Sequence, residues 1–167
     1  MSPVNDFGDE LVENNRRYAA GFVNYGLPTE PSRRLAVLTC MDSRIDVFAA
    51  LGLHLGEAHV LRNAGGIVTD DVLRSLLLSQ YLLGTDSVML IHHTGCGLLR
   101  FRDDELADAV ERDTGVRPQM PLGAITNLDD SVRTSMARIR DAGFLPHGDA
   151  VRGFVYELET GRLREVV

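Results

Sequence analysis

Two cysteines and one histidine are the residues of this sequence best suited to hold a metal ion. Cys40 and Cys96 are the only cysteines of the chain, and His93 stands before the second of them in the spacing His-x-x-Cys. Thiolate and imidazole groups suit zinc, and three protein ligands leave a fourth position for water or for a weaker protein ligand. The alternative is a pair of buried structural thiols, because free cysteine is among the most buried residue types.

The segment that begins at Cys40 favours the metal site. It reads Cys-Met-Asp-Ser-Arg, so the carboxylate of Asp42 and the guanidinium of Arg44 closely follow the thiol. Asp42 can fill the fourth zinc position, or it can pair with Arg44 and leave that position to water. The sequence therefore predicts a metal site with two states: closed, with Asp42 as the fourth ligand, or open, with water in the fourth position.

The remaining histidines are less favoured as metal ligands. Alternation along a strand would turn the ring of His92 to the face opposite His93, so we expect His92 to be packed in the interior or to lie behind the site. Three others are isolated in the sequence and are predicted to be surface or structural residues, with proton transfer as the less favoured alternative: His54, His59 and His147.

The elements that must position these side chains follow from an alternation of short apolar runs with amphipathic stretches. The apolar runs predict strands over residues 35–39, 58–61, 87–92, 151–158 and 163–166. Helical spacing predicts helices over 9–22 and 46–53, from Thr69 or Asp70 to Leu83, and from Asp129 onward. We therefore expect one α/β domain over 34–167, a mainly parallel sheet flanked by helices, preceded by an N-terminal helical arm over 1–33.

This sheet would bring the candidate ligands together. In parallel sheets of this kind, ligands bind beyond the carboxyl ends of the strands. Cys40 directly follows the first predicted strand, and His93 with Cys96 follows the third. If those two strands are neighbours, the three side chains converge without a long loop.

Composition excludes some partners. The chain has 24 acidic and 17 basic residues, a net charge of -7, and its arginines are scattered, so nucleic acid is not an expected partner. The N-terminus has neither a basic start nor an apolar core, and no apolar run approaches the roughly 18 residues that a membrane span needs. We therefore expect a cytoplasmic protein without a membrane partner, in which cysteines stay reduced unless they are redox-active or bind metal.

Three motifs, in this order, resemble those of the β-class carbonic anhydrases: Cys40-Met41-Asp42-Ser43-Arg44, Arg62-Asn63-Ala64-Gly65-Gly66 and His93-Thr94-Gly95-Cys96-Gly97. The resemblance runs from about Leu35 to Leu98. The short chain and the His92-His93 pair are similar to the compact bacterial branch of the family, which also includes relatives that hydrolyse carbonyl sulfide or carbon disulfide.

The resemblance implies one zinc ion per chain, held by Cys40, His93 and Cys96. Asp42 and Arg44 would be the catalytic pair, in which Arg44 draws the carboxylate away from zinc; Asp42 would be a fourth ligand in a closed state. The activity would be reversible hydration of carbon dioxide to bicarbonate and a proton by zinc-bound hydroxide. Two thiolates make the site a poorer acid than three imidazoles would, so we expect the rate to rise with pH.

Other readings remain open. The same site could hydrolyse carbonyl sulfide or carbon disulfide, and the chain could instead be a non-catalytic binding protein that zinc stabilises. The resemblance also implies that the loop Asn63-Ala64-Gly65-Gly66 lines the active-site cleft, although a tight turn before a helix would explain its glycines as well. Finally, it implies that the arm embraces a second subunit, giving a homodimer or a higher homo-oligomer with the active site at the interface.

Overall fold

A five-stranded sheet forms the centre of the molecule in the computed structural model, of which residues 7–167 are described. The strand order is β2-β1-β3-β4-β5, parallel from β2 to β4 and antiparallel between β4 and β5. The predicted fold class, a mainly parallel sheet flanked by helices, is thereby confirmed. The strands are β1 (Leu35–Cys40), β2 (Ala58–Asn63), β3 (Ser87–His93), β4 (Val151–Glu157) and β5 (Arg162–Val166).

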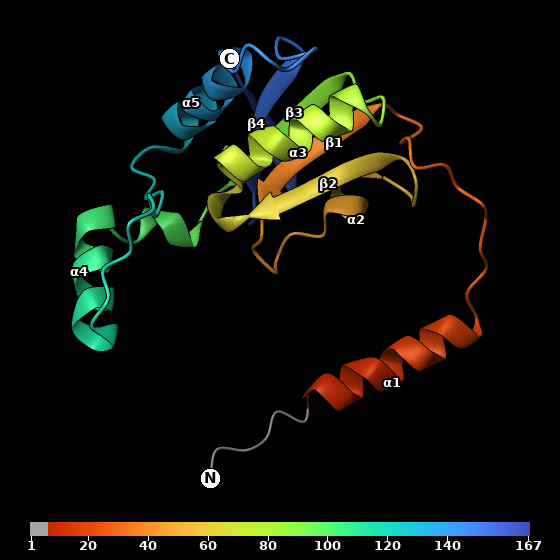
Figure 1. Cartoon of the computed structure of the whole chain (residues 1–167), viewed down its shortest axis with the longest axis horizontal. Helices are drawn as coiled ribbons and strands as arrows, with labels where there is room; N and C mark the ends of the chain where they lie inside the picture. The colour runs from red at the N-terminus through yellow and green to blue at the C-terminus, as the bar shows by residue number, and fades with distance from the viewer. Residues whose placement is uncertain (1–6) are drawn as a thin grey trace.

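Helices cover both faces of this sheet (Figure 1). Helices α3 and α5 pack on one face through a cluster that includes Leu38, Leu76 and Ile139, and α2 packs on the other through a cluster that includes Val37 and Val47. The helices are α1 (Phe7–Ala20), α2 (Val47–Leu51), α3 (Asp70–Tyr81), α4 (Asp103–Thr114) and α5 (Leu128–Arg140), with short 3-10 helices η1 (Ala64–Gly66) and η2 (Gly97–Leu99).

The boundaries of the predicted helices follow their caps. The hydroxyl of Thr69 accepts a hydrogen bond from the backbone N–H of Val72, which fixes the start of α3 as predicted. The helix ends at Tyr81, so Leu83 lies beyond it rather than within it. Asp46 and Gly52 cap α2 at its two ends, so the helix predicted over 46–53 is present and spans Val47–Leu51.

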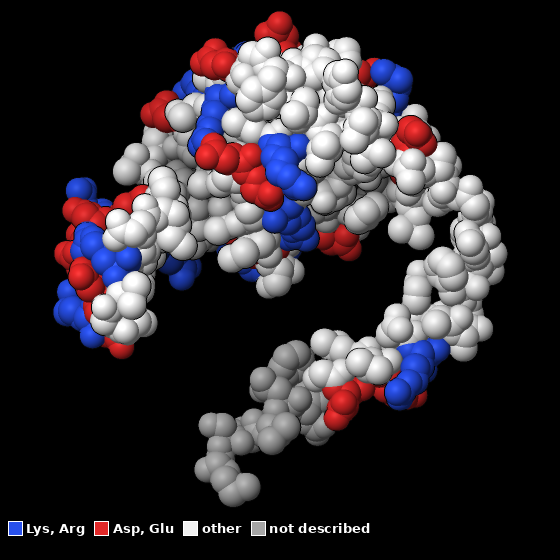
Figure 2. All heavy atoms as spheres, viewed as in Figure 1, with Lys and Arg blue, Asp and Glu red and all other residues white. Residues whose placement is uncertain are grey.

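Helix α4 is not among the predicted elements. Only Ala107 of its side chains is buried, so it lacks the apolar stripe that marks a helix in sequence. Acidic and basic side chains are interspersed along α4 and over the face of the molecule drawn in Figure 2. This charge mixture gives that face no basic stripe.

Helix α1 stands away from the sheet at the end of an extended segment (Figure 1). Its apolar side chains and those of the following segment are exposed: Leu11 59%, Tyr18 61%, Phe22 54% and Val23 57%. Residues 1–6 of the predicted arm lie outside the described part of the chain. Among the described residues, no helix combines the length and apolarity needed to cross a membrane.

Asp103 fixes the loop that returns from α4 toward the sheet. Its carboxylate accepts hydrogen bonds from the backbone N–H groups of Leu122, Gly123 and Ala124 at 3.1, 3.2 and 2.7 Å. These bonds outweigh the effect of burial and lower the pKa of Asp103. They also place Gly123 close to Ile67: a Cβ atom on residue 123 would lie 2.5 Å from Cδ1 of Ile67.

We predict that Asp103→Asn lowers the free energy of unfolding by about 1 kcal/mol at neutral pH, because a neutral amide accepts these bonds less strongly than a carboxylate. The folded pKa lies below the unfolded one, so this contribution is present above the unfolded pKa of about 3.9 and is lost as pH falls. Urea unfolding between about pH 7 and pH 2 should show the difference from wild type shrinking. Asp113→Asn, an exposed carboxylate of the same helix, is the control. A pH-independent difference would contradict the account.

Candidate metal centre

The three predicted ligands converge at the carboxyl ends of β1 and β3. One ligand atom from each of Cys40, His93 and Cys96 lies within 4.8 Å of the other two, and all three residues are buried. Cys40 is the last residue of β1 and His93 the last of β3. Because these strands are parallel neighbours, their ends meet at one edge of the sheet.

The ring of His93 is oriented for a metal ion. Its Nδ1 lies 2.8 Å from the carbonyl oxygen of Thr94, which can only accept, so Nδ1 carries a proton and, in the neutral ring, Nε2 keeps its lone pair. Nε2 is buried and has no hydrogen-bond partner among the described residues. A metal ion would satisfy this atom, and a carbonyl behind the ring is the usual support of a histidine ligand.

The donor set and its dimensions fit zinc. A tetrahedral zinc ion, with bonds of about 2.3 Å to sulfur and about 2.0 Å to nitrogen, separates its ligand atoms by roughly 3.5–3.8 Å. The three atoms already lie within 4.8 Å, so little movement would close them around an ion. Two thiolates and one imidazole are among the ligands that zinc prefers.

Backbone amides support the thiolate of Cys40. Burial raises its pKa, but the neighbouring His93 ring and hydrogen bonds from the amides of Asp42 and Gly65 outweigh burial and lower the pKa to about 7. The N–H of Gly65 lies 3.3 Å from Sγ. Burial raises the pKa of Cys96, so Cys40 is the more readily ionised of the two thiols.

The turn that supplies this amide requires glycine. Gly65 and Gly66 have φ values of 80° and 66°, in the left-handed region. A Cβ on Gly66 would lie 2.8 Å from the carbonyl carbon of Thr39 and 2.9 Å from the nitrogen of Cys40. The turn predicted from these glycines therefore packs directly on the end of β1, beside the metal cluster.

Asp42 lies at the edge of the cluster and is held by Arg44. Nε and Nη2 of Arg44 donate to its two carboxylate oxygens at 2.9 and 2.7 Å, and Nη2 also donates to the carbonyl of Gly95 at 3.0 Å. This pairing lowers the pKa of Asp42 well below its usual range. Oδ2 of Asp42 is nevertheless only 3.8 Å from Nε2 of His93. The carboxylate is thus ionised, adjacent to the ligands and turned onto Arg44.

His92 lies on the opposite face of β3, as alternation predicts, because its neighbours Val88 and Leu90 on that face pack under α3 and α5. It is fully buried, and neither ring nitrogen has a partner among the described residues. Burial lowers the pKa of His92 to about 4 and keeps the ring neutral.

The isolated histidines lie outside the metal cluster. Ring Nδ1 of His59 lies 2.7 Å from the hydroxyl of Ser79, at the outer strand of the sheet. His54 and His147 lie in the loops that follow α2 and α5. Asn63 and Ala64 precede the glycine turn, and the amide of Asn63 donates to the carbonyl of Ile67 at 2.8 Å.

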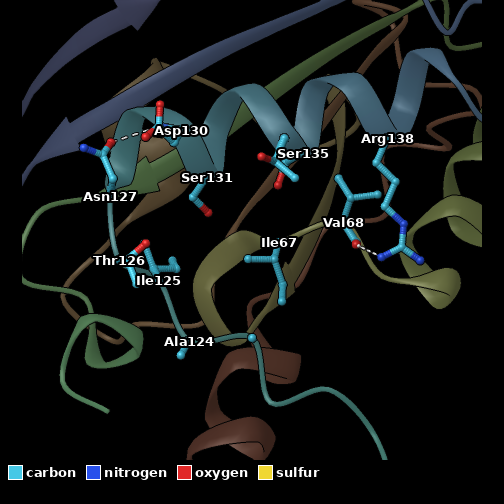
Figure 3. Close-up of a pocket in the computed structure, with 12 residues that line it drawn as sticks. Ile67, Val68, Ala124, Ile125, Thr126, Asn127, Asp130, Ser131, Ser135 and Arg138 are labelled. Atoms are coloured by element: carbon cyan, nitrogen blue, oxygen red, sulfur yellow. Dashed lines mark hydrogen bonds between the residues drawn. The ribbon is translucent and has the colours of Figure 1, made fainter. Parts of the chain in front are cut away.

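A cavity of about 340 Å³ lies between α5 and the segment 123–127 (Figure 3). Figure 3 shows Arg138 donating to the carbonyl of Val68 at its rim, with a distance of 2.8 Å. Serine, threonine and asparagine side chains line much of it, together with Ile67. None of the three metal-cluster residues lines this cavity, so it is separate from the cluster.

Some contacts of the site were beyond sequence reasoning. The Thr94 carbonyl behind His93 and the Gly65 amide on Cys40 are main-chain groups, which residue type does not reveal. Arg62 belongs to the second motif, but the sequence gives it no role. In the structure its guanidinium contacts the main chain of the Cys40–Asp42 segment.

Comparison with known proteins agrees with this geometry. The family model described as carbonic anhydrase matches residues 35–163. The chain is 46% identical to β-carbonic anhydrase 1 of Mycobacterium tuberculosis over 158 residues, which span 95% of this chain and 96% of that protein. It is 34% identical to the carbon disulfide hydrolase of Saccharolobus solfataricus over 189 aligned residues, spanning 97% of this chain and 90% of that protein.

Solved structures give the same result. The crystal structure of carbonic anhydrase from Streptococcus mutans matches with a TM-score of 0.90 and 40% identity, covering 98% of this chain and 99% of that one. The carbonic anhydrase from Glaciozyma antarctica matches with a TM-score of 0.86 and 37% identity, covering 98% and 100%. Because the family model, the relatives and the solved structures agree over most of its length, the chain belongs to the β-carbonic anhydrase family, which uses zinc.

Proposed function

We propose that the protein is a zinc-dependent carbonic anhydrase, a lyase that interconverts carbon dioxide and bicarbonate at the cluster of Cys40, His93 and Cys96. The observation that carries this proposal is the pairing of Asp42 with Arg44 beside three converged ligands. The cluster offers a metal ion three protein ligands, and the pairing keeps the neighbouring carboxylate from being the fourth. An open fourth position is the mark of a catalytic zinc site.

The groups of the chain have distinct tasks in this reaction. Cys40, His93 and Cys96 hold zinc, which when bound lowers the pKa of a coordinated water and so supplies a nucleophile near neutral pH. Asp42 accepts a hydrogen bond from the attacking oxygen and thereby directs a lone pair toward the carbon of the substrate. Since its pKa is strongly lowered, Asp42 stays a hydrogen-bond acceptor and does not store the proton. The proton of each turnover must therefore leave by another route.

A second candidate function keeps the site and changes the substrate to carbon disulfide or carbonyl sulfide. The 34% identity with a carbon disulfide hydrolase favours this alternative enough to test it. A structural zinc site is the third candidate. It would need a fourth protein ligand, and the engagement of Asp42 by Arg44 argues against it.

We predict that the purified protein carries one zinc ion per chain and hydrates carbon dioxide at a rate that rises from about pH 6.5 to 9, because two thiolates weaken zinc as an acid. Stopped-flow kinetics and metal analysis on one sample check both. His93→Ala should lose zinc and activity, whereas His147→Ala, in a loop away from the cluster, should keep both. One zinc with no turnover, or a much higher efficiency on carbon disulfide, would contradict the first proposal.

The exposed arm supports a homodimer. We propose that residues 1–33 serve as an arm that packs on a second copy, while 34–167 form the catalytic domain. No other part of the described chain, residues 7–167, covers the apolar side chains of α1 and of the segment after it: Leu11, Tyr18, Phe22 and Val23 are each more than half exposed. We place the protein in the cytoplasm, where a reducing environment keeps Cys40 and Cys96 available for zinc.

We predict a mass of at least two chains by size-exclusion chromatography with light scattering at micromolar concentration. Tyr18→Asp combined with Phe22→Asp should shift the protein toward one chain, because charges would replace two adjacent, mutually tilted aromatic rings of the arm. Arg17→Ser, an exposed polar position of the same helix, should not. A single-chain mass for the wild type would contradict the dimer.

A further inference from the structure

Arg62 braces the main chain on both sides of Met41. It lies on β2, where it pairs in register with Thr39 of β1. Its Nε donates to the carbonyl of Cys40 at 2.9 Å, and its Nη2 donates to the carbonyl of Asp42 at 2.7 Å. The flat guanidinium fork can reach two separate acceptors at once, which a lysine ammonium does less well. One side chain thus ties a predicted metal ligand and the neighbouring carboxylate residue to the adjacent strand.

We infer that Arg62 is a positioning residue that keeps Asp42 turned onto Arg44 and away from the metal. The inference rests on the proposed function, because it concerns the fourth position of the same site. Both hydrogen bonds of Arg62 to the segment go to carbonyl oxygens, so it acts on Asp42 through the backbone. Arg44 restrains the carboxylate itself. The two arginines therefore control different parts of one residue.

The geometry shows why a second restraint is needed. Oδ2 of Asp42 lies 3.8 Å from Nε2 of His93, so the carboxylate is already beside an atom of the cluster. A carboxylate is a good zinc ligand, and a short movement would place it in the fourth position. The Arg44 side chain is 53% exposed, so solvent competes for its pairing with Asp42. A fixed backbone limits how far Asp42 can turn when that pairing opens.

The neighbouring strand supports the same segment. The N–H of Met41 donates to the carbonyl of Asn63 at 2.8 Å, which extends the pairing of β1 with β2 past the end of β1. The residue between the two braced carbonyls is thus also tied to β2. Without Arg62, the Cys40–Asp42 segment would keep only this bond and the register pairing of Cys40 with Asn63 among its described main-chain links to β2.

The inference is tested with cobalt-substituted protein and azide, an anion that binds an open metal position and changes the cobalt absorption spectrum. Azide affinity is measured for wild type, Arg62→Gln, Asp42→Ala and the double variant. We expect Arg62→Gln to weaken azide binding on the order of tenfold or more and to lower kcat/KM for carbon dioxide similarly, since small misplacements in a site have effects of this size. Arg62→Lys should lie between wild type and Arg62→Gln.

The double variant separates positioning from general damage. Without the Asp42 carboxylate nothing can close the site, so Arg62→Gln should have no further effect on azide affinity in the Asp42→Ala background. Arg164→Gln on β5 removes a two-point ion pair with Asp129 of α5 and controls for the loss of an arginine. An unchanged azide affinity in Arg62→Gln, or an equal loss with and without Asp42, would overturn the inference.

Two further outcomes concern the folding of the variant and the activity of the wild type. If Arg62→Gln does not fold, the same comparison is made with Arg62→Lys, and equal azide affinities for Arg62→Lys and wild type would overturn the inference. If wild-type protein binds azide but does not hydrate carbon dioxide, the proposed function fails while the azide comparison still tests the role of Arg62.

Discussion

The parallel pairing of β1 with β3 is the constraint on which the site depends. It brings Cys40 and His93 to the same edge of the sheet, and the loop after β3 returns Cys96 to the same place. The strands are fixed by apolar side chains on both faces, with Leu38 and Leu90 under α3 and α5, and Val37 and Ile91 on the α2 side. The core thus sets the spacing of the ligands before any metal binds.

Charge balance is the second constraint. Two thiols and a carboxylate lie close together, and if both thiols ionise to bind a metal, the like charges would repel one another without compensation. The amide of Gly65 supports Cys40, and Arg44 neutralises Asp42. A zinc ion would complete this balance, with the lone pair of His93 Nε2 as the neutral ligand. The arrangement explains why the carboxylate can lie near the metal position without occupying it.

The sequence predicted the ligand set because the relevant information was local. Cys40 and His93 end apolar runs, and the alternation of strands and helices indicates a parallel sheet. That β1 and β3 are neighbours was only a condition of the prediction, and the structure supplies it. The contacts that refine the site were not predictable in this way, because Thr94 and Gly65 act through main-chain atoms and Arg62 crosses between strands. Helix α4 was not predicted because it has no apolar stripe. The loop beside it is held by hydrogen bonds from backbone amides to Asp103, which residue type does not reveal.

The most direct test of this account is a crystal structure of the zinc-loaded protein at neutral pH, with the ion located by anomalous scattering at the zinc edge. The account predicts one ion per chain bonded to Cys40, His93 and Cys96, a water at the fourth position, and Asp42 on Arg44. Zinc elsewhere in the chain would contradict the assignment of the ligands. Zinc at the cluster with Asp42 as its fourth ligand would contradict the open site from which the proposed activity follows.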